Sequence, residues 1–576
     1  MVSLRGDLGQ GREYGLTMSD RPDDPERGAG EPKPPKKKAE DNPWYLLATL
    51  YGVPTTWDVE LRAKNRVAWN RYFAENLDEE TRTKLVEEKR HLAEELTPFS
   101  PDELREVQTA FAERCKASAK KLALPASDGD IDFSNVKFEQ DVFFGGYLVS
   151  RRPSFRSATS RRALFGSATS GRALFDGATF SGDACFEGAT FAGGATFGGA
   201  TFSSLANFHV TFFAGADFGG ATFSGDAHFS GVTFFGRATF GGATFSAMAD
   251  FAAATFPGDA RFHGATFAGG ATFVGATFSS WADFHATFFA ARADFGGATF
   301  SGDVHFVGAA FGDASFHGAA FGHAFFHGAT FARAVFGGAT FSDWASFRGA
   351  AFSGMAHFGG ATFSDMADFD GAKFQTSSSF VNAEMKNTTS FEGAIFKTEP
   401  PKFFGAKLHQ GTVWRGIKWP PKPKDNKEAG AFIDAYACLK LEMDRLKKHD
   451  DELDFFALEL QSRRIEQGPV WGFPFAIYGV LSGYGRSYLR PLGALFVVVA
   501  TGAVAFWRFD ARSFAEALGL SAANTLNVFG FRRDFNLAID DTPFAWLKVF
   551  AAGQTIFGTI LLFLFGLGIR NKFRMK

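Results

Sequence analysis

Apolar and polar residues alternate in a short unit that recurs from about residue 131 to residue 396. Ala and Phe stand two positions apart with Thr or Asp between them, as in Ala178-Thr179-Phe180. Because side chains alternate between the two faces of a strand, this spacing predicts short strands with Ala and Phe inward and Thr outward. Gly-Gly, Ser-Gly and Gly-Asp pairs follow, and they suit corners where a positive φ is often needed. Each unit is therefore predicted to be one short strand and one corner.

The distance between successive Phe residues alternates between five and six, which gives a period of about 11. An 11-residue repeat can also build a right-handed supercoil of helices. However, a helix turns by about 100° per residue, so Phe residues at these distances would fall on scattered faces. A glycine in nearly every unit would also cost a helix about 1 kcal/mol each time. The fixed period instead predicts a solenoid of short strands.

These units resemble the pentapeptide-repeat family, in which a small Ala stands two positions before a central Leu or Phe. In that family four units make one turn of a right-handed, square-sided β-helix. The resemblance implies a mainly β fold, a right-handed quadrilateral β-helix over residues 130–408, with roughly 12 coils and a length on the order of 60 Å. The extra residue of alternate units must lie at corners. At double Phe sites such as Phe212-Phe213 and Phe288-Phe289 the sequence does not tell which Phe points inward, so the exact register is left open. The expected core residues are Phe180, Phe186, Phe191, Phe197, Phe202, Phe223, Phe245 and Phe267.

The flanking regions have different patterns. Residues 1–41 are polar and rich in proline, which predicts a disordered tail. Residues 42–124 predict a helical region, with a capping box at Ser100 and Glu103, and we expect it to cover the exposed backbone of the first coil. The repeats are expected to end near Leu408, and Trp419 begins a proline-rich linker. Residues 428–467 then predict a cytoplasmic helical hairpin.

Two apolar runs near the C-terminus are long enough to cross a bilayer, which takes about 20 residues. Residues 491–507 carry no charge, and residues 549–569 have Gln554 as their one strongly polar member. We therefore predict a membrane domain over residues 468–576, with transmembrane helices at about 490–508 and 548–569. Residues 470–484, rich in aromatic residues and glycine, are expected to lie in the membrane interface.

The segment between the two runs is short and amphipathic, with Thr and Gly near its end. A span, such a segment and a second span resemble the two-helix pore module of potassium-type channels. Residues 525–531 lack the Thr-Val-Gly-Tyr-Gly filter whose carbonyls coordinate the ion. A bare membrane anchor and a conducting pore both remain as alternatives.

Basic residues precede the first run and follow the second, so in a chain that crosses the membrane twice they lie on the same side of it. Since short basic flanks stay in the cytoplasm, both termini and the rod are predicted to be cytoplasmic, at a bacterial inner membrane. The three cysteines, Cys115, Cys185 and Cys438, are far apart and suit a reducing compartment rather than a disulfide framework. The flanking basic residues are Arg463, Arg464, Arg486 and Arg490 before the first run, and Arg570, Lys572, Arg574 and Lys576 after the second.

The net charge of −2 implies no general attraction to nucleic acid. Residues 172–397 hold 17 acidic and nine basic side chains, a difference of eight, and gyrase-inhibiting members of the family present an acidic rod that imitates DNA. Here arginines interleave with the acids, so a mixed, solvated surface is favoured over a DNA mimic. Nine of the twelve histidines lie in the repeats, and His263 and His285 would stack one coil apart. Neither joins a four-ligand cluster, so we expect polar surface positions and no metal.

No catalytic motif accompanies these features, so we expect no enzyme activity and no cofactor. The favoured interpretation is a membrane-anchored scaffold whose cytoplasmic β-helix binds a protein partner of unknown identity. The alternative is a channel-like homo-oligomer with the rod as its cytoplasmic regulatory part. A DNA-mimicking inhibitor is the least favoured interpretation.

Overall fold

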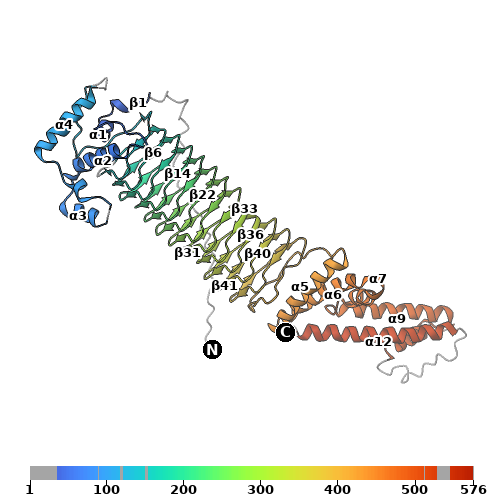
Figure 1. The fold of residues 1–576 in the computed structure, drawn as a ribbon. Coiled ribbons are helices and arrows are strands. Elements are labelled where there is room, and N and C mark those ends of the chain that lie inside the picture. The colour runs from blue at the N-terminus through green and yellow to red at the C-terminus, as the bar shows by residue number, and fades with distance from the viewer. Residues whose placement is uncertain are drawn as a thin grey trace, which may run out of the picture.

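A computed structural model of the protein describes residues 35–88, 90–116, 121–149, 153–510, 513–527 and 545–574. Figure 1 shows a long rod of stacked β coils with helices at both of its ends. The N-terminal helices are α1 (Pro43–Ala48), α2 (Val59–Ala74), α3 (Glu79–Glu87) and α4 (Pro101–Cys115). The C-terminal helices are α5 (Asn426–Arg445), α6 (His449–Glu466), α7 (Gly468–Trp471), α8 (Phe473–Ser482), α9 (Leu489–Phe509), α10 (Phe514–Thr525) and α12 (Ala545–Arg574).

The rod is a β-solenoid whose strands pair in parallel with those of the next coil. One coil holds β9 (Thr179–Phe180), β10 (Ala184–Cys185), β11 (Thr190–Phe191) and β12 (Ala195–Thr196). The next coil repeats them, so that Phe180 pairs with Phe202 and Ala184 with Ala206. Nearly all the strands from β2 (Val136–Lys137) to β47 (Ile395–Phe396) have two residues. The predicted β-helix of about 12 coils is thus confirmed.

The interior of the rod contains four columns of aromatic rings. Within a column, each ring stacks on the ring one coil away, as for Phe245 and Phe267, whose centroids are 4.7 Å apart with an angle of 1° between the planes. Rings of adjacent columns meet edge to face, as for Phe267 and Phe273 at 6.1 Å. Offset stacking and edge contacts are the two arrangements that aromatic quadrupoles favour. The predicted core residues Phe180, Phe186, Phe191, Phe197, Phe202, Phe223, Phe245 and Phe267 all lie in these columns, with at most 4% of their surface exposed.

The irregular period of the sequence is absorbed at the corners. In a six-residue unit, Ser181, Gly182 and Asp183 form the corner between β9 and β10, whereas Glu187 and Gly188 suffice after β10. At two of the five-residue steps one strand runs through the corner, in β33 (Ala310–Ser315) and β36 (Thr330–Val335). At the two double Phe sites named from the sequence the second ring is the inward one: Phe213 and Phe289 are buried, and Phe288 is 48% exposed. At Phe234-Phe235 the first ring is inward instead, and Phe235 is 61% exposed.

The C-terminal end of the rod lies beyond its predicted limit at residue 408. Isolated bridges join Ser390 to Val413 and Ile395 to Lys418. The ring of Trp414 stacks on Phe391 at 4.9 Å, and that of Trp419 stacks on Phe396 at 5.6 Å. The predicted boundary was wrong because two tryptophans take the places of Phe in the last coil, so Trp419 belongs to the rod rather than to a linker.

The predicted tail was also wrong for residues 35–41. Strand β1 (Lys37–Lys38) pairs in parallel with β2, and Ala39 is only 2% exposed. The backbone of β1 occupies the open edge of the first coil while both lysine side chains stay exposed, so a polar sequence suffices for this pairing. Residues 1–34 of the predicted tail lie outside the described residues.

Helices cover both ends of the rod. In the N-terminal region, Trp69 donates to the carbonyl of Leu148 at 2.8 Å, and the side chain of Asn70 accepts from Leu148 N at 2.7 Å. These bonds satisfy backbone groups that the first coil would otherwise leave unpaired. At the other end, Phe455 of α6 meets the ring of Trp414 edge to face at 5.5 Å. Phe455 is 2% exposed, so α6 is anchored to the last coil by a buried ring.

Candidate functional site in the C-terminal helices

The helices α9 and α12 lie side by side (Figure 1). Each is long and apolar enough to cross a membrane, and only 28% of the apolar window of each is buried. Large apolar side chains on these helices are mostly exposed, with exposed fractions of 69% for Phe496, 73% for Val549 and 69% for Phe563. An exposed apolar surface of this extent is typical of a surface that contacts lipid or neighbouring copies of the chain.

Helix α10 returns alongside α9 toward the middle of this pair. It begins with a capping box in which Ser513 and Glu516 satisfy each other's backbone N–H groups. Eight residues later, the Ser521 hydroxyl donates to the carbonyl of Val499, in the middle of α9, at 2.7 Å. Near its end, Thr525 packs directly on Gly558 of α12, where a Cβ atom would collide with its carbonyl oxygen. Helix α10 therefore ends about halfway along the two apolar helices.

A cluster of buried polar side chains surrounds the end of α10. The Gln554 side chain of α12 donates to Ser521 Oγ at 2.6 Å and to the carbonyl of Val498 at 3.2 Å. The Thr555 hydroxyl donates to the carbonyl of Asn524 at 3.1 Å. Gly502 of α9 is required here, because a Cβ atom at this position would overlap Gln554 and Ser521. We call Ser521, Asn524, Thr525, Gln554 and Thr555 the buried polar cluster.

Part of this cluster has no hydrogen-bond partner. The Asn524 side chain is fully buried, and neither Nδ2 nor Oδ1 has a partner among the described residues. The same holds for Oε1 of Gln554, which is 5% exposed. A buried polar group left unpaired costs about 1–3 kcal/mol. The cluster thus carries a cost that simple anchoring of the chain would not require.

From the sequence, only Gln554 was singled out in this region, as the one strongly polar residue of its apolar run. Thr525 was predicted to lie near the end of the segment between the runs, and no contact between Thr525 and Gln554 was predicted. Ser521 and Asn524 are three residues apart on one face of α10, and this spacing was a usable signal. Their proximity to Gln554 depends on the fold and could not be read from the local pattern.

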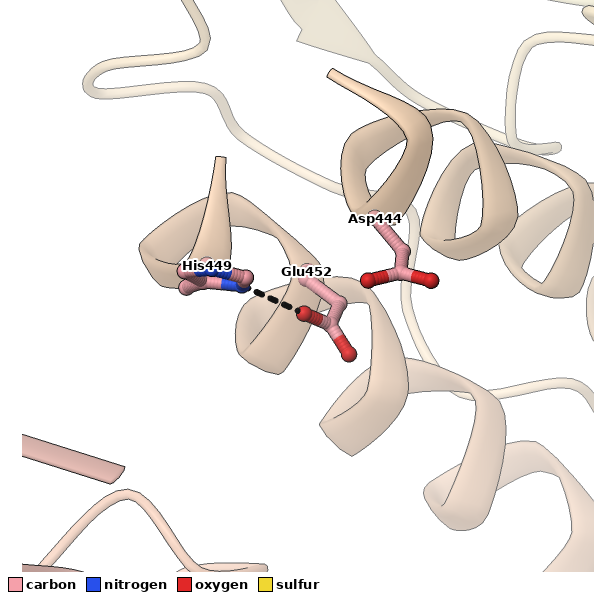
Figure 2. A group of neighbouring side chains, drawn as sticks. All are labelled: Asp444, His449 and Glu452. Carbon is pink, nitrogen blue, oxygen red and sulfur yellow. Dashed lines mark hydrogen bonds and ion pairs between the residues drawn. The ribbon is translucent and has the colours of Figure 1, made fainter. Parts of the chain in front are cut away.

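A second group of polar side chains lies at the turn between α5 and α6. Figure 2 shows Asp444 pointing toward His449 and Glu452, whose Nδ1 and Oε2 atoms are 3.0 Å apart. Their potential ligand atoms lie within 4.8 Å of one another. His449 and Glu452 occupy the first turn of α6, where negative charge stabilises the helix start. Since a structural zinc site needs four ligands, we assign no metal here, and the absence of a metal stays a prediction.

The rod can now be compared with known proteins. Residues 186–233 and 229–277 match the family model described as pentapeptide repeats (9 copies). These coils are pentapeptide repeats. Among solved structures, the chain is similar to HetL, a pentapeptide repeat protein involved in heterocyst differentiation regulation from the cyanobacterium Nostoc sp. strain PCC 7120. That alignment has 15% identity, a TM-score of 0.14, and covers 50% of this chain and 90% of HetL. No curated protein matches the chain.

The surface of the pentapeptide-repeat rod carries paired charges. Arg156 lies 3.1 Å from Asp176 of the next coil, Arg292 lies 2.7 Å from Asp294, and Arg348 lies 3.2 Å from Asp370. The predicted histidine pair is also part of this surface, with His263 Nδ1 at 3.9 Å from a carboxylate oxygen of Asp283. Exposed pairs of this kind contribute at most about 1 kcal/mol each.

One patch of the pentapeptide-repeat rod departs from this pattern. On the outer face of β35 (Ala324–Phe325), Phe325 stacks on His305 at 4.7 Å and meets Trp344 edge to face at 5.4 Å. His305 also contacts Trp281 at 6.0 Å. Burial lowers the pKa of His305 and of His327 below the usual value for histidine. We call Trp281, His305, Phe325, His327 and Trp344 the aromatic patch. The sequence pattern did not predict this patch, although Phe325-Phe326 is a further double Phe site.

Proposed function

We propose that the protein is a membrane-anchored pentapeptide-repeat protein whose C-terminal helices assemble into a channel-like oligomer, with the rod as its cytoplasmic regulatory part. The observation that carries this proposal is the end of α10, where the fully buried Asn524 amide lies halfway along the two apolar helices without a hydrogen-bond partner in the described chain. At that depth in a bilayer, polar groups are tolerated where they face protein or a water-filled cavity. A water-filled path that reaches the end of α10 in the oligomer would supply such surroundings.

The arrangement is difficult to explain as a bare anchor. Two apolar helices suffice to hold a rod at a membrane, whereas α10 adds the buried, unpaired amide of Asn524, which costs free energy. The C-terminal end of α10 also carries partial negative charge and lies at mid-depth, which favours cations over anions. We therefore expect the oligomer to prefer cations.

The proposal is tested by ion flux from liposomes that contain the full-length protein. Asn524→Leu removes the unpaired amide and keeps the volume of the side chain, so the helices should fold at least as stably as before. If the amide lines a conduction path, this variant should change the flux. The control is Thr559→Val, since the exposed Thr559 hydroxyl bonds only to its own helix at Thr555 O, 2.8 Å away. Wild-type protein that is inserted and oligomeric but passes no ions would contradict the proposal.

The scaffold that the sequence favoured is a second candidate, and the aromatic patch supports it. Phe325 and His305 stand where most other coils of this sheet present Thr, Asp or Ser, as at Thr239, Asp283 and Ser346. Aromatic residues dominate the binding energy of many protein interfaces. In pull-downs with the full-length protein in detergent, Phe325→Ser should release a partner that Phe288→Ser retains, because Phe288 is an outward Phe on β29 (Phe288–Phe289), away from the patch. Equal retention by the two variants would argue against a role of the patch.

A further inference from the structure

A cavity of about 420 Å³ lies where α6 meets α7 and α8, between the rod and the apolar helices. Lys422 reaches it from the segment that follows the last coil of the rod, and Arg464 from the end of α6. Phe473 contributes from α8, and Tyr484 from the turn before α9. The cavity is thus built by the segments that connect the rod to the apolar helices, and its lining includes Lys422, Gln461, Arg464, Ile465, Phe473 and Tyr484.

The cations of the cavity are not neutralised by the protein. Within the described ranges, Lys422 and Arg464 form no ion pair, while the adjacent Arg463 pairs with Glu459 at 2.8 Å. The acids nearest to Lys422 in the sequence are used elsewhere: Asp425 accepts from Glu428 N at 2.8 Å, and Glu428 accepts from Lys424 N at 2.9 Å. The cavity therefore holds two uncompensated positive charges.

Gln461 adds an amide to these cations. Its side chain forms no hydrogen bond within the part of the chain that is described, so its N–H groups are free to donate. Two cations and an amide donor around one space suit an anionic group with several acceptor oxygens. Phosphate is such a group, and arginine in particular binds it with two parallel hydrogen bonds.

An exposed apolar surface lies directly beside this cavity. The helices α7 and α8 present Val470, Trp471, Phe473 and Val480, with exposed fractions of 75%, 77%, 61% and 73%. Phe473 belongs both to this surface and to the cavity lining. Trp and other large apolar residues beside basic residues are typical of the interface of a membrane. The expected ligand therefore has an anionic head and an apolar tail.

We propose that the cavity binds the phosphate head group of an anionic phospholipid of the cytoplasmic leaflet. Lys422, Arg464 and Gln461 bind the phosphate oxygens, and Ile465 and Phe473 contact the glycerol and the start of the acyl chains. The proposal rests on the membrane anchoring contained in the proposed function. Because the ligand bridges the end of the rod, α6 and α8, it fixes the rod relative to the apolar helices. Its loss would therefore loosen that junction.

The test measures binding of dioleoylphosphatidylglycerol to the full-length protein in detergent micelles, from the rise in thermal unfolding temperature with lipid concentration. Dioleoylphosphatidylcholine and inorganic phosphate are titrated in parallel. We expect phosphatidylglycerol to stabilise the wild type more than phosphatidylcholine. Lys422→Gln with Arg464→Gln should weaken phosphatidylglycerol binding by roughly tenfold or more, since two charge-assisted hydrogen bonds are lost.

The matched control is Lys418→Gln with Lys427→Gln, which removes the same charge from two exposed lysines outside the cavity lining. It should bind phosphatidylglycerol like the wild type. Equal stabilisation by both lipids, or equal binding by the two double variants, would overturn the proposal. Full stabilisation by inorganic phosphate alone would also overturn it, because the ligand would then be a soluble anion.

Carbonate extraction of cell membranes separates this proposal from the one on which it rests. A wild-type chain that carbonate releases from the membrane is not inserted, and the proposed function fails with it. A chain that stays in the membrane but shows no lipid preference overturns only the phospholipid site.

Discussion

Truncating one core ring should loosen the rod locally rather than as a whole. Phe267 is fully buried, and its ring stacks between Phe245 at 4.7 Å and Phe289 at 4.8 Å. It also meets Phe273 edge to face at 6.1 Å. A fourth, tilted contact joins it to Phe262 at 6.4 Å. The substitution Phe267→Ala removes all four ring contacts and leaves a cavity in one column, while the strand backbone can stay as it is.

The expected loss of stability follows from these contacts. A buried Phe→Ala change lowers the free energy of unfolding by about 3–5 kcal/mol. This total includes about 0.5–1.5 kcal/mol for each lost ring pair, in addition to the loss of buried apolar area. In a solenoid each coil contacts only its neighbours, so this cost falls on the coils beside Phe267. Since about 1.4 kcal/mol is a factor of ten, the open population of those coils should rise by roughly a hundredfold to several thousandfold.

Hydrogen exchange of the full-length protein, resolved to single peptides, measures this rise. The amide of Ala268 donates to Phe245 O at 2.8 Å, and that of Ala290 donates to Phe267 O at 2.9 Å, so both report on the affected coils. The control is Thr266→Ala, because Thr266 is the outward neighbour of Phe267 and is only half-buried. Its effect should stay below about 1 kcal/mol.

Two results would refute the reasoning. Equal exchange at Ala268 and Ala290 in the two variants would mean that Phe267 is not an inward residue. Faster exchange in Phe267→Ala at a distant coil as well, for instance at Ser203 N, which donates to Phe180 O at 2.8 Å, would mean that the rod unfolds as one unit.

Three further predictions follow from single positions. Ser160 takes the place of a ring between Phe138 and Phe180, beside a cavity of about 10 Å³, and its buried hydroxyl has no hydrogen-bond partner in the described ranges. Ser160→Val should therefore stabilise these coils by about 1 kcal/mol, measured by a denaturant titration followed by limited proteolysis. A loss of stability would contradict this. Gly242 has a φ of +65° and Gly430 lies inside α5, both with open space around them, so Gly242→Ala should lower and Gly430→Ala should raise the thermal unfolding temperature, each by the equivalent of about 1 kcal/mol. A reporter that folds only in the cytoplasm should be active when fused after Lys576, and a cysteine at the exposed Ala515, near the start of α10, should react with an impermeant reagent from outside the cell. An inactive reporter after Lys576 would contradict the predicted topology.

The rod could be predicted from the sequence because its information is local. Each unit contains its own inward Ala and Phe, and the parallel pairing of similar units in successive coils then follows without information from distant parts of the sequence. The errors fell at the two ends, where the pattern stops. Trp414 and Trp419 fill ring positions that a search for Phe passes over, and β1 reaches the first coil from a segment about 100 residues away, whose two lysines carry no sign of pairing.

The C-terminal helices could be predicted as elements but not as a site. Two apolar runs and a capped segment between them are visible in the sequence, and both helices and α10 are present. What the pattern leaves open is the direction of α10, because a capped amphipathic helix can lie on the membrane surface as well as enter it. The hydrogen bond from Ser521 to Val499 O shows that α10 packs along the middle of α9, and it joins residues on two different elements.

The glycines opposite α10 strengthen the case that this depth has a function. Gly502 and Gly558 lie in the middle of α9 and α12, and any larger side chain there would displace Gln554 or the end of α10. Helix α10 therefore enters a space made by two small residues, and it brings the unpaired amide of Asn524 with it. Packing in lipid can explain close contact between helices, but it does not explain why the residue brought to this position is an asparagine whose side chain has no hydrogen-bond partner within the described chain. Leucine would fill a similar volume without the cost of about 1–3 kcal/mol. In the proposed channel, water that reaches the end of α10 would give that amide a partner, which is why Asn524→Leu separates a channel from an anchor.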